Sequence, residues 1–323
     1  MLTETDLART STAFRRVVDN VERVISGGRE AVEAAVVCLF AEGNLLVEGV
    51  PGVGKTMLAR AVAASIDGSF SRVQATPDLL PSDLTGISVY DQEAKEFRFV
   101  PGPIFANVVL VDEINRTTPR TQSALLEPME ERQVTVENVT HRLPEPYLLI
   151  ATENPIEQHG TYPLPEGQLD RFTMTVNVGY PGHEAAREVV RRQMLHHPID
   201  DLLPVLSAEE VTGHQQAVRT VNVDPAIVDY VVMLVQATRA HAEAVLGASP
   251  RSMLALTRTA QARAVAEGRT FVLPDDVKAL APAVLGHRLV LKSYGPGGSA
   301  RGAEVVRSIL EQVPVPLGLP GRA

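Results

Sequence analysis

Residues 49–56 constrain the fold of this chain more than any other segment. They read Gly49-Val50-Pro51-Gly52-Val53-Gly54-Lys55-Thr56, a complete G-x-x-x-x-G-K-T sequence. The apolar residues 45–47 before it predict a buried strand, and the Ala-rich residues 57–64 after it predict a helix. A glycine loop in this context binds polyphosphates, because glycine lets successive backbone N–H groups curve around the anion and the helix N-terminus adds partial positive charge. The segment therefore predicts a nucleotide-binding loop.

The loop also assigns roles to single side chains. Lys55 is expected to reach the β- and γ-phosphates of ATP, and Thr56 to place its hydroxyl on Mg²⁺. We expect nucleotide contacts along the whole loop and from the residue after it, that is from Gly49, Val50, Pro51, Gly52, Val53, Gly54, Lys55, Thr56 and Met57.

Four further short runs predict strands, at residues 70–74, 108–111, 147–152 and 173–178. Helical patterns lie between them, notably over residues 121–132. Strands that alternate with helices form a parallel sheet covered on both faces. The first part of the chain is therefore predicted to be an α/β core of the P-loop NTPase type.

The pattern changes after residue 181. From His183 onward only helices are predicted, at about 183–196, 207–218, 224–241, 250–267 and 274–286. A Gly/Pro-rich stretch follows, with one short helix at about 303–312. We predict an α/β core over 1–181 with N-terminal helices, an all-helical lid domain over 182–292, and a C-terminal segment over 293–323. A length of 323 residues fits more than one domain.

Two acids follow the apolar run 108–111. Asp112 is placed to hold Mg²⁺ together with Thr56, directly or through water. Glu113 is placed to orient and polarise an attacking water, as a hydrolase requires when it forms no covalent intermediate. A polar strand end with solvated acids is the alternative, but the phosphate loop upstream favours the catalytic interpretation.

Three further residues are candidates with open alternatives. Asn154 ends an apolar strand, where its amide could bind the γ-phosphate or the water, although Asn-Pro is also a turn signal. Arg171 could neutralise charge on the transferred phosphoryl group, or it could pair with Asp170 at the surface. Arg251 stands at a helix start, where a solvated arginine is equally compatible with the sequence.

Taken in order, these motifs resemble the MoxR family of AAA+ ATPases. The resemblance extends over roughly residues 20–315, and its most specific parts are the strings after Asp112 and over residues 162–172. It is carried by residues 49–56, 110–116, 151–155, 162–172, 247–251, 272–277 and 287–289. One departure is Gly167, where the family pattern usually has a helix-favouring alanine.

The resemblance implies roles for the open residues. Asn154 takes the sensor-1 position, Arg171 the position of an arginine finger that reaches a neighbouring subunit's ATP, and Arg251 the sensor-2 position in the lid. Whether Arg251 acts on its own nucleotide or on a neighbour's stays open. Hairpins predicted within 83–103 and 133–144 would be insertions facing the pore of a ring, or else ordinary surface ribbons.

The implied activity is Mg²⁺-dependent ATP hydrolysis by a ring, which is expected to be a hexamer. The ring would remodel client proteins, activate them, or insert metal cofactors into them. A protein with a von Willebrand factor A domain is the expected partner. Two alternatives are a nucleic-acid-dependent, helicase-like motor and a non-hydrolysing ATP-gated scaffold. A net charge of −9 and only 4% aromatic residues speak against nucleic acid, and the intact set Glu113, Asn154 and Arg171 speaks against the scaffold.

The chain is expected to be cytoplasmic. No apolar stretch approaches the ~18 residues of a membrane-spanning helix, and the N-terminus lacks the apolar core of a signal peptide. The single cysteine, Cys38, fits a reducing compartment.

Overall fold

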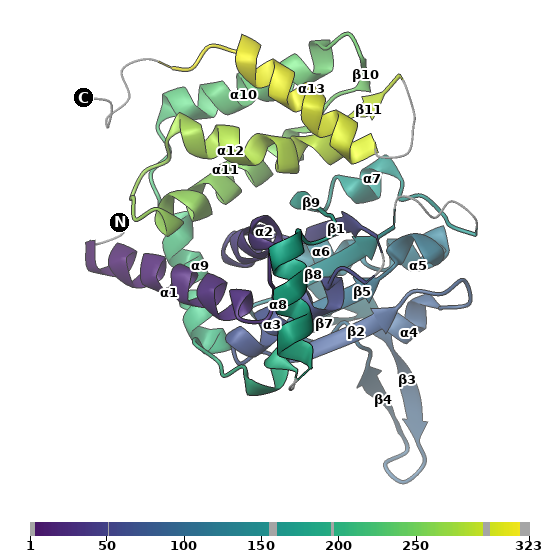
Figure 1. Cartoon of the computed structure of the whole chain (residues 1–323). Helices are drawn as coiled ribbons and strands as arrows, with labels where there is room; N and C mark the ends of the chain where they lie inside the picture. The colour runs from purple at the N-terminus through teal and green to yellow at the C-terminus, as the bar shows by residue number, and fades with distance from the viewer. Residues whose placement is uncertain (1–3, 51, 155–159, 195–196, 293–297, 317–323) are drawn as a thin grey trace.

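The computed structural model describes residues 4–50, 52–154, 160–194, 197–292 and 298–316. A five-stranded sheet lies at the centre, with the strand order β2-β5-β8-β1-β9, and all neighbouring strands are parallel (Figure 1). The strands are β1 (Leu45–Gly49), β2 (Phe70–Gln74), β5 (Val108–Asp112), β8 (Leu148–Glu153) and β9 (Met174–Val178). The predicted parallel α/β core is confirmed.

Alternate residues of the central strands enter two different hydrophobic clusters. Leu45 and Val47 belong to a cluster shared with α1 (Glu4–Glu22), α2 (Arg29–Phe40) and α3 (Lys55–Ser65), whereas Leu46 belongs to a second cluster on the opposite face. All five residues of β1 and of β5 are buried, which requires cover on both faces.

The helix predicted over 121–132 forms as two short helices. These are α5 (Pro119–Ser123) and α6 (Leu126–Glu131), which cover the second face of the sheet together with α4 (Pro81–Thr85). Pro128 explains the interruption, because it has no N–H to donate to the carbonyl of Ala124 and its ring crowds the preceding turn. The sequence prediction was wrong in treating the segment as continuous.

Both predicted hairpins form as antiparallel ribbons. The first joins β3 (Gly86–Asp91) to β4 (Glu96–Pro101) and projects from the body of the molecule (Figure 1). The second joins β6 (Gln133–Val136) to β7 (Val139–Arg142). The hairpins touch, because the rings of Phe99 and His141 stack with centroids 3.9 Å apart.

The C-terminal part is mainly helical and lies against the sheet and α2. Its helices are α8 (His183–Gln193), α9 (Ala208–Arg219), α10 (Pro225–Ala240), α11 (Pro250–Ala266), α12 (Pro274–Leu285) and α13 (Gly298–Gln312). Helix α13 begins at Gly298 rather than near 303 and packs on the Gly286–Arg288 turn, where a Cβ on Gly302 would lie 2.0 Å from the Gly286 carbonyl oxygen.

The expectation of helices alone was not met in this region. Strands β10 (Ala244–Leu246) and β11 (Val290–Leu291) pair in an antiparallel ladder. Strands of two and three residues are too short to show an alternating pattern, so periodicity could not reveal them.

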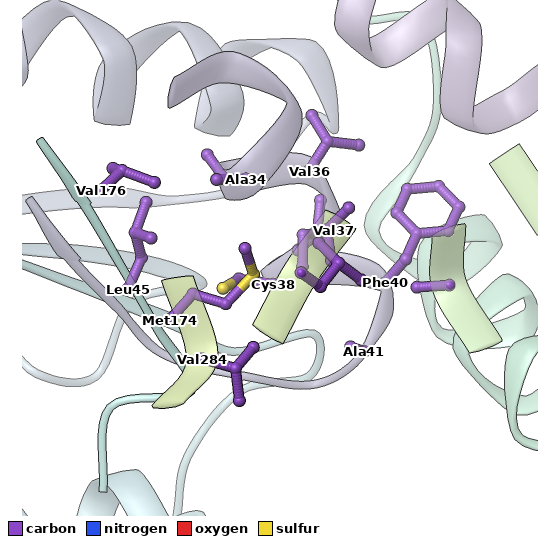
Figure 2. Packing of buried hydrophobic residues seen from close by; sticks show 14 of the residues in the cluster. Ala34, Val36, Val37, Cys38, Phe40, Ala41, Leu45, Met174, Val176 and Val284 are labelled. Atoms are coloured by element: carbon purple, nitrogen blue, oxygen red, sulfur yellow. The ribbon is translucent and has the colours of Figure 1, made fainter. Parts of the chain in front are cut away.

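The hydrophobic core runs without a break from the sheet into the lid. Cys38 of α2 lies among Met174 of β9 and Val284 of α12 (Figure 2). Burial raises the pKa of the Cys38 thiol, which makes it a packed apolar group rather than a reactive one. Within the part of the chain that the structure describes, no helix is both long enough and apolar enough to span a membrane.

Candidate nucleotide site

The glycine loop lies between β1 and α3, as its sequence predicts. Gly52 and Gly54 have φ values of 81° and 92°, in the left-handed region that favours glycine. Lys55 is the first residue of α3, and its Nζ donates a 2.7 Å hydrogen bond to the Gly49 carbonyl. Burial lowers the pKa of Lys55, against the opposing effect of Asp112 and nearby acids. Pro51 was also assigned to the loop and lies outside the described residues.

Thr56 and the two acids at the end of β5 meet beside this loop. The hydroxyl Oγ1 of Thr56 lies 3.4 Å from Asp112 Oδ2. The hydroxyl of Thr152, on the neighbouring strand β8, donates to Asp112 Oδ1 at 2.6 Å and accepts from the Glu113 backbone N–H at 2.8 Å. Thr152 therefore fixes the Asp112 carboxylate and the start of the Glu113 turn, which has a left-handed backbone with φ 58°.

The donors at this corner fit Mg²⁺. A threonine hydroxyl and a carboxylate are hard oxygen ligands, and Mg²⁺ is commonly held by one or two carboxylates plus substrate phosphates and water. No group of three or more His, Cys, Asp or Glu side chains suited to a metal occurs among the described residues. The site thus offers part of a coordination shell, which a bound triphosphate would complete.

Asn154 follows β8, the strand between β5 and β1, and is buried. Its neighbour Glu153 lies opposite Glu48 of β1 in the strand register. Burial, followed by the charge of Glu48, raises the pKa of Glu153 to about 7, although Lys55 opposes this shift. Glu48 accepts a hydrogen bond from Ser299 at the start of α13, so the C-terminal helix contacts the strand that carries the loop.

The two candidate arginines lie side by side, away from the loop. Arg171 follows α7 (Glu166–Leu169), and its Nε lies 3.1 Å from Glu130 Oε2. Arg251, near the start of α11, donates from Nη2 to Glu130 Oε1, and its Nη1 lies 3.4 Å from Asp170 Oδ2. The sequence analysis offered a surface ion pair with Asp170 as the alternative role of Arg171. That partner was wrong, because the Arg171 guanidinium pairs with Glu130.

Buried groups from the lid hold the turn that carries Arg171. Arg288 Nη2 donates to the carbonyls of Asp170 and Phe172, at 3.1 and 2.7 Å, and its Nε lies 3.1 Å from Asp170 Oδ1. Burial is the main cause that lowers the pKa of Arg288, to about 10, so it stays charged at neutral pH. His287 Nε2 also lies 3.1 Å from the Phe172 carbonyl, and burial lowers the pKa of this imidazole to about 3.

The direction of the strands places Arg171 at the N-terminal end of the β1–β9 pair, whereas the glycine loop lies at the C-terminal end. In the parallel β1–β9 pair, Gly49 lies opposite Val178 at the C-terminal end of β9. Arg171 precedes β9, where the Thr173 N–H donates to the carbonyl of Asn44, just before β1 begins. At about 3.3 Å per residue, the five-residue strand spans roughly 16 Å. Arg171 therefore lies at the end of the β1–β9 pair opposite to the glycine loop of its own chain.

Comparisons with known proteins agree with this architecture. Residues 44–174 match the model of the ATPase family associated with various cellular activities, and residues 236–309 match an AAA lid domain. The chain is 46% identical to the protein YeaC of Bacillus subtilis, over 94% of each chain. It is 40% identical to Chaperone MoxR1 of Mycobacterium tuberculosis, over 96% of this chain and 84% of the relative. The chain belongs to the MoxR family of AAA+ ATPases.

A solved structure supports the same fold. A protein from Cytophaga hutchinsonii superposes with a TM-score of 0.86 at 36% identity, covering 96% of this chain and 97% of that one. The AAA+ core with a helical lid is thereby confirmed, and ATPase activity is the general property of the matched family.

The sequence analysis missed two residues of β2, Arg72 and Gln74, that lie at the candidate nucleotide site of this MoxR-family chain. Arg72 donates to Asp112 Oδ2 from Nη2 at 2.7 Å and from Nε at 3.2 Å. Gln74 accepts from Arg72 Nη2 at 2.9 Å and donates to Glu113 Oε2 at 3.2 Å. The available signal was the spacing of two polar residues at i and i+2, which places both on one face of a strand. It pointed to the site only once β2 was known to lie beside β5.

Proposed function

We propose that this protein is an Mg²⁺-dependent ATPase that works as a ring, with each active site shared between two subunits. The separation of Arg171 from its own glycine loop, across the whole length of β9, carries this proposal. An arginine that neutralises charge on a transferred phosphoryl group must touch it. Arg171 can do so only on the nucleotide of a neighbouring chain.

The same geometry bears on whether Arg251 acts on its own nucleotide or on that of a neighbouring subunit. This lid arginine shares Glu130 with Arg171, so it lies beside the arginine that faces the neighbour. We therefore assign Arg251 to the neighbour's nucleotide as well. Within one subunit, Lys55 would bind the β- and γ-phosphates, Thr56 and Asp112 would hold Mg²⁺, Glu113 would polarise the water, and Asn154 would orient it.

The work done by the ring is proposed from resemblance. A relative that covers most of the chain is named a chaperone, which supports ATP-driven remodelling or activation of client proteins. A hexamer, a von Willebrand factor A partner, metal-cofactor insertion and a cytoplasmic location belong to the same proposal. The net charge of −9 and the 4% aromatic residues speak against the helicase-like alternative, and the intact set Glu113, Asn154 and Arg171 speaks against the scaffold.

The experiment is ATP hydrolysis per subunit against protein concentration. We expect specific activity to rise steeply with concentration. Arg171→Ala should abolish hydrolysis yet leave nucleotide affinity unchanged, whereas Lys55→Ala should lose both. Arg191→Ala is the matched control, because Arg191 is an exposed arginine whose Nη2 lies 2.8 Å from Glu188. Activity that is flat with concentration and insensitive to Arg171→Ala would refute the shared site.

A further inference from the structure

Glu130 of α6 binds both candidate arginines at once. Its Oε2 lies 3.1 Å from Nε of Arg171, and its Oε1 accepts from Nη2 of Arg251. Arg171 lies in the part of the chain that matches the AAA family, and Arg251 lies in the part that matches the AAA lid domain. One carboxylate therefore bridges two domains through two like-charged groups that would otherwise repel each other.

Glu130 and a second carboxylate, Asp170, form one cluster of ion pairs with Arg171, Arg251 and Arg288. Asp170 makes the more buried contacts of this cluster. Asp170 accepts from the Ser249 hydroxyl at 2.8 and 2.9 Å and lies 3.1 Å from the buried Arg288. The side chains of Asp170 and Arg288 are 19% and 2% exposed, so this pair fastens lid to core from inside. The side chains of Glu130 and Arg251 are about 40% exposed, so the Glu130 bridge lies at the surface, where an incoming anion can meet it.

The charge of the cluster favours such an anion. Three guanidinium groups, Arg171, Arg251 and Arg288, are balanced by two carboxylates, Glu130 and Asp170, which leaves one positive charge over. Arg171 and Arg251, whose side chains are 24% and 40% exposed, have long side chains with many rotamers, and Glu130 holds them in one arrangement.

We infer that Glu130 is a positioning residue that holds Arg171 and Arg251 as a pair, so that core and lid present both to one phosphate group of the neighbouring subunit's nucleotide. This inference rests on the proposed shared site. The position of Arg171 then depends on the position of the lid. A lid movement that carries Arg251 away also removes one partner of Glu130, the carboxylate that orients Arg171.

The test compares Glu130→Gln with Glu131→Gln. Both substitutions remove one carboxylate from α6, but among the described residues Glu131 binds Gln133 and no arginine. In Glu130→Gln one guanidinium faces an amide N–H₂ in place of a carboxylate oxygen. We expect its turnover per subunit at saturating protein and ATP to fall about tenfold, as a misplaced catalytic group does. The affinity for a fluorescent ADP analogue should stay as in wild type, and Glu131→Gln should keep wild-type turnover. The melting temperature of Glu130→Gln should fall by no more than a few degrees, because ion pairs at a partly exposed carboxylate contribute little to stability.

Mixing experiments distinguish positioning across the interface from an effect within one subunit. Glu130→Gln subunits have an intact loop, and Lys55→Ala subunits have an intact arginine pair. Mixed rings should recover activity, because some sites combine the two intact halves. Equal turnover of Glu130→Gln and Glu131→Gln, or loss of activity without recovery on mixing, would overturn the inference. A wild-type activity that is flat with concentration would instead refute the shared site itself.

Discussion

The Nη2 atom of Arg72 lies 2.7 Å from Oδ2 of Asp112, the same carboxylate oxygen that lies 3.4 Å from the Thr56 hydroxyl. A cationic side chain thus binds the oxygen that faces the proposed Mg²⁺ position. The other oxygen, Oδ1, accepts from Thr152. Arg72 and a metal ion would draw on the same negative charge.

We therefore predict that Arg72→Gln tightens Mg²⁺ binding. The arginine side chain is 46% exposed, and ion pairs of this kind contribute about 0.5–1 kcal/mol. Removing the competing charge should lower the Mg²⁺ concentration for half-maximal binding of a fluorescent ADP analogue by about two- to fivefold. Arg72→Lys keeps the charge and should lie close to wild type. A higher Mg²⁺ requirement in Arg72→Gln would show that the arginine supports the metal site instead.

Contacts such as this one mark the limit of what the sequence could predict. Apolar runs ending in polar residues located Asp112, Glu113 and Asn154 at strand ends, because a buried parallel strand has a strong one-dimensional signature. The order of the strands has no such signature, so the approach of Arg72 to Asp112 was invisible. The domain boundary near residue 181 stays a prediction.

The arginine cluster shows the same limit over longer separations. Glu130, Arg171, Arg251 and Arg288 come from four segments that only the folded chain brings together. The family resemblance assigned roles to Arg171 and Arg251, but it gave no reason to connect them. Their common partner Glu130 lies in α6. The sequence predicted this segment as part of one continuous helix, which Pro128 divides into α5 and α6.

Gly167 offers a test of local backbone preference. It lies inside α7, has a φ outside the positive range, and a Cβ there would meet nothing within 4 Å. Gly167→Ala should stabilise the protein by about 0.5–1 kcal/mol, because alanine loses less backbone entropy in a helix. Calorimetry should show a slightly raised melting temperature.

Gly86→Ala is the contrasting variant for this prediction. Gly86 has a φ of +93°, and a Cβ there would lie 2.3 Å from the Val100 carbonyl oxygen. It should lower the melting temperature by several degrees. Equal effects of the two alanines would contradict the assignment of Gly167 to a relaxed helical conformation.

Glu153 should make stability depend on pH. Its pKa is raised from 4.5 to about 7, first by burial and then by Glu48. The folded state therefore binds this proton more tightly than the unfolded chain, so stability is greatest below the unfolded pKa and falls as pH rises toward 7. Glu153→Gln removes the titration and should gain about 1–3 kcal/mol over wild type at pH 8, but little at pH 4.5.

Melting temperatures of the nucleotide-free protein across pH 4.5–8 measure this difference. Glu93→Gln, at the exposed turn between β3 and β4, is the control for loss of one negative charge. A gain from Glu153→Gln that does not change with pH would mean that packing, rather than the buried charge, is responsible.

Asp170 should be the acid on which the core–lid contact most depends. Its side chain is the anion beside Arg288, whose own side chain is only 2% exposed. Asp170→Ala leaves a guanidinium buried without that countercharge, and we expect a loss of about 3 kcal/mol in the free energy of unfolding. Adding Arg288→Met removes the stranded charge with a side chain of similar length. The double variant should therefore recover part of the lost melting temperature, although it has lost more polar contacts than Asp170→Ala alone. If the double variant melts lower still, the hydrogen bonds from Arg288 to the Asp170 and Phe172 carbonyls stabilise the junction more than the ion pair does.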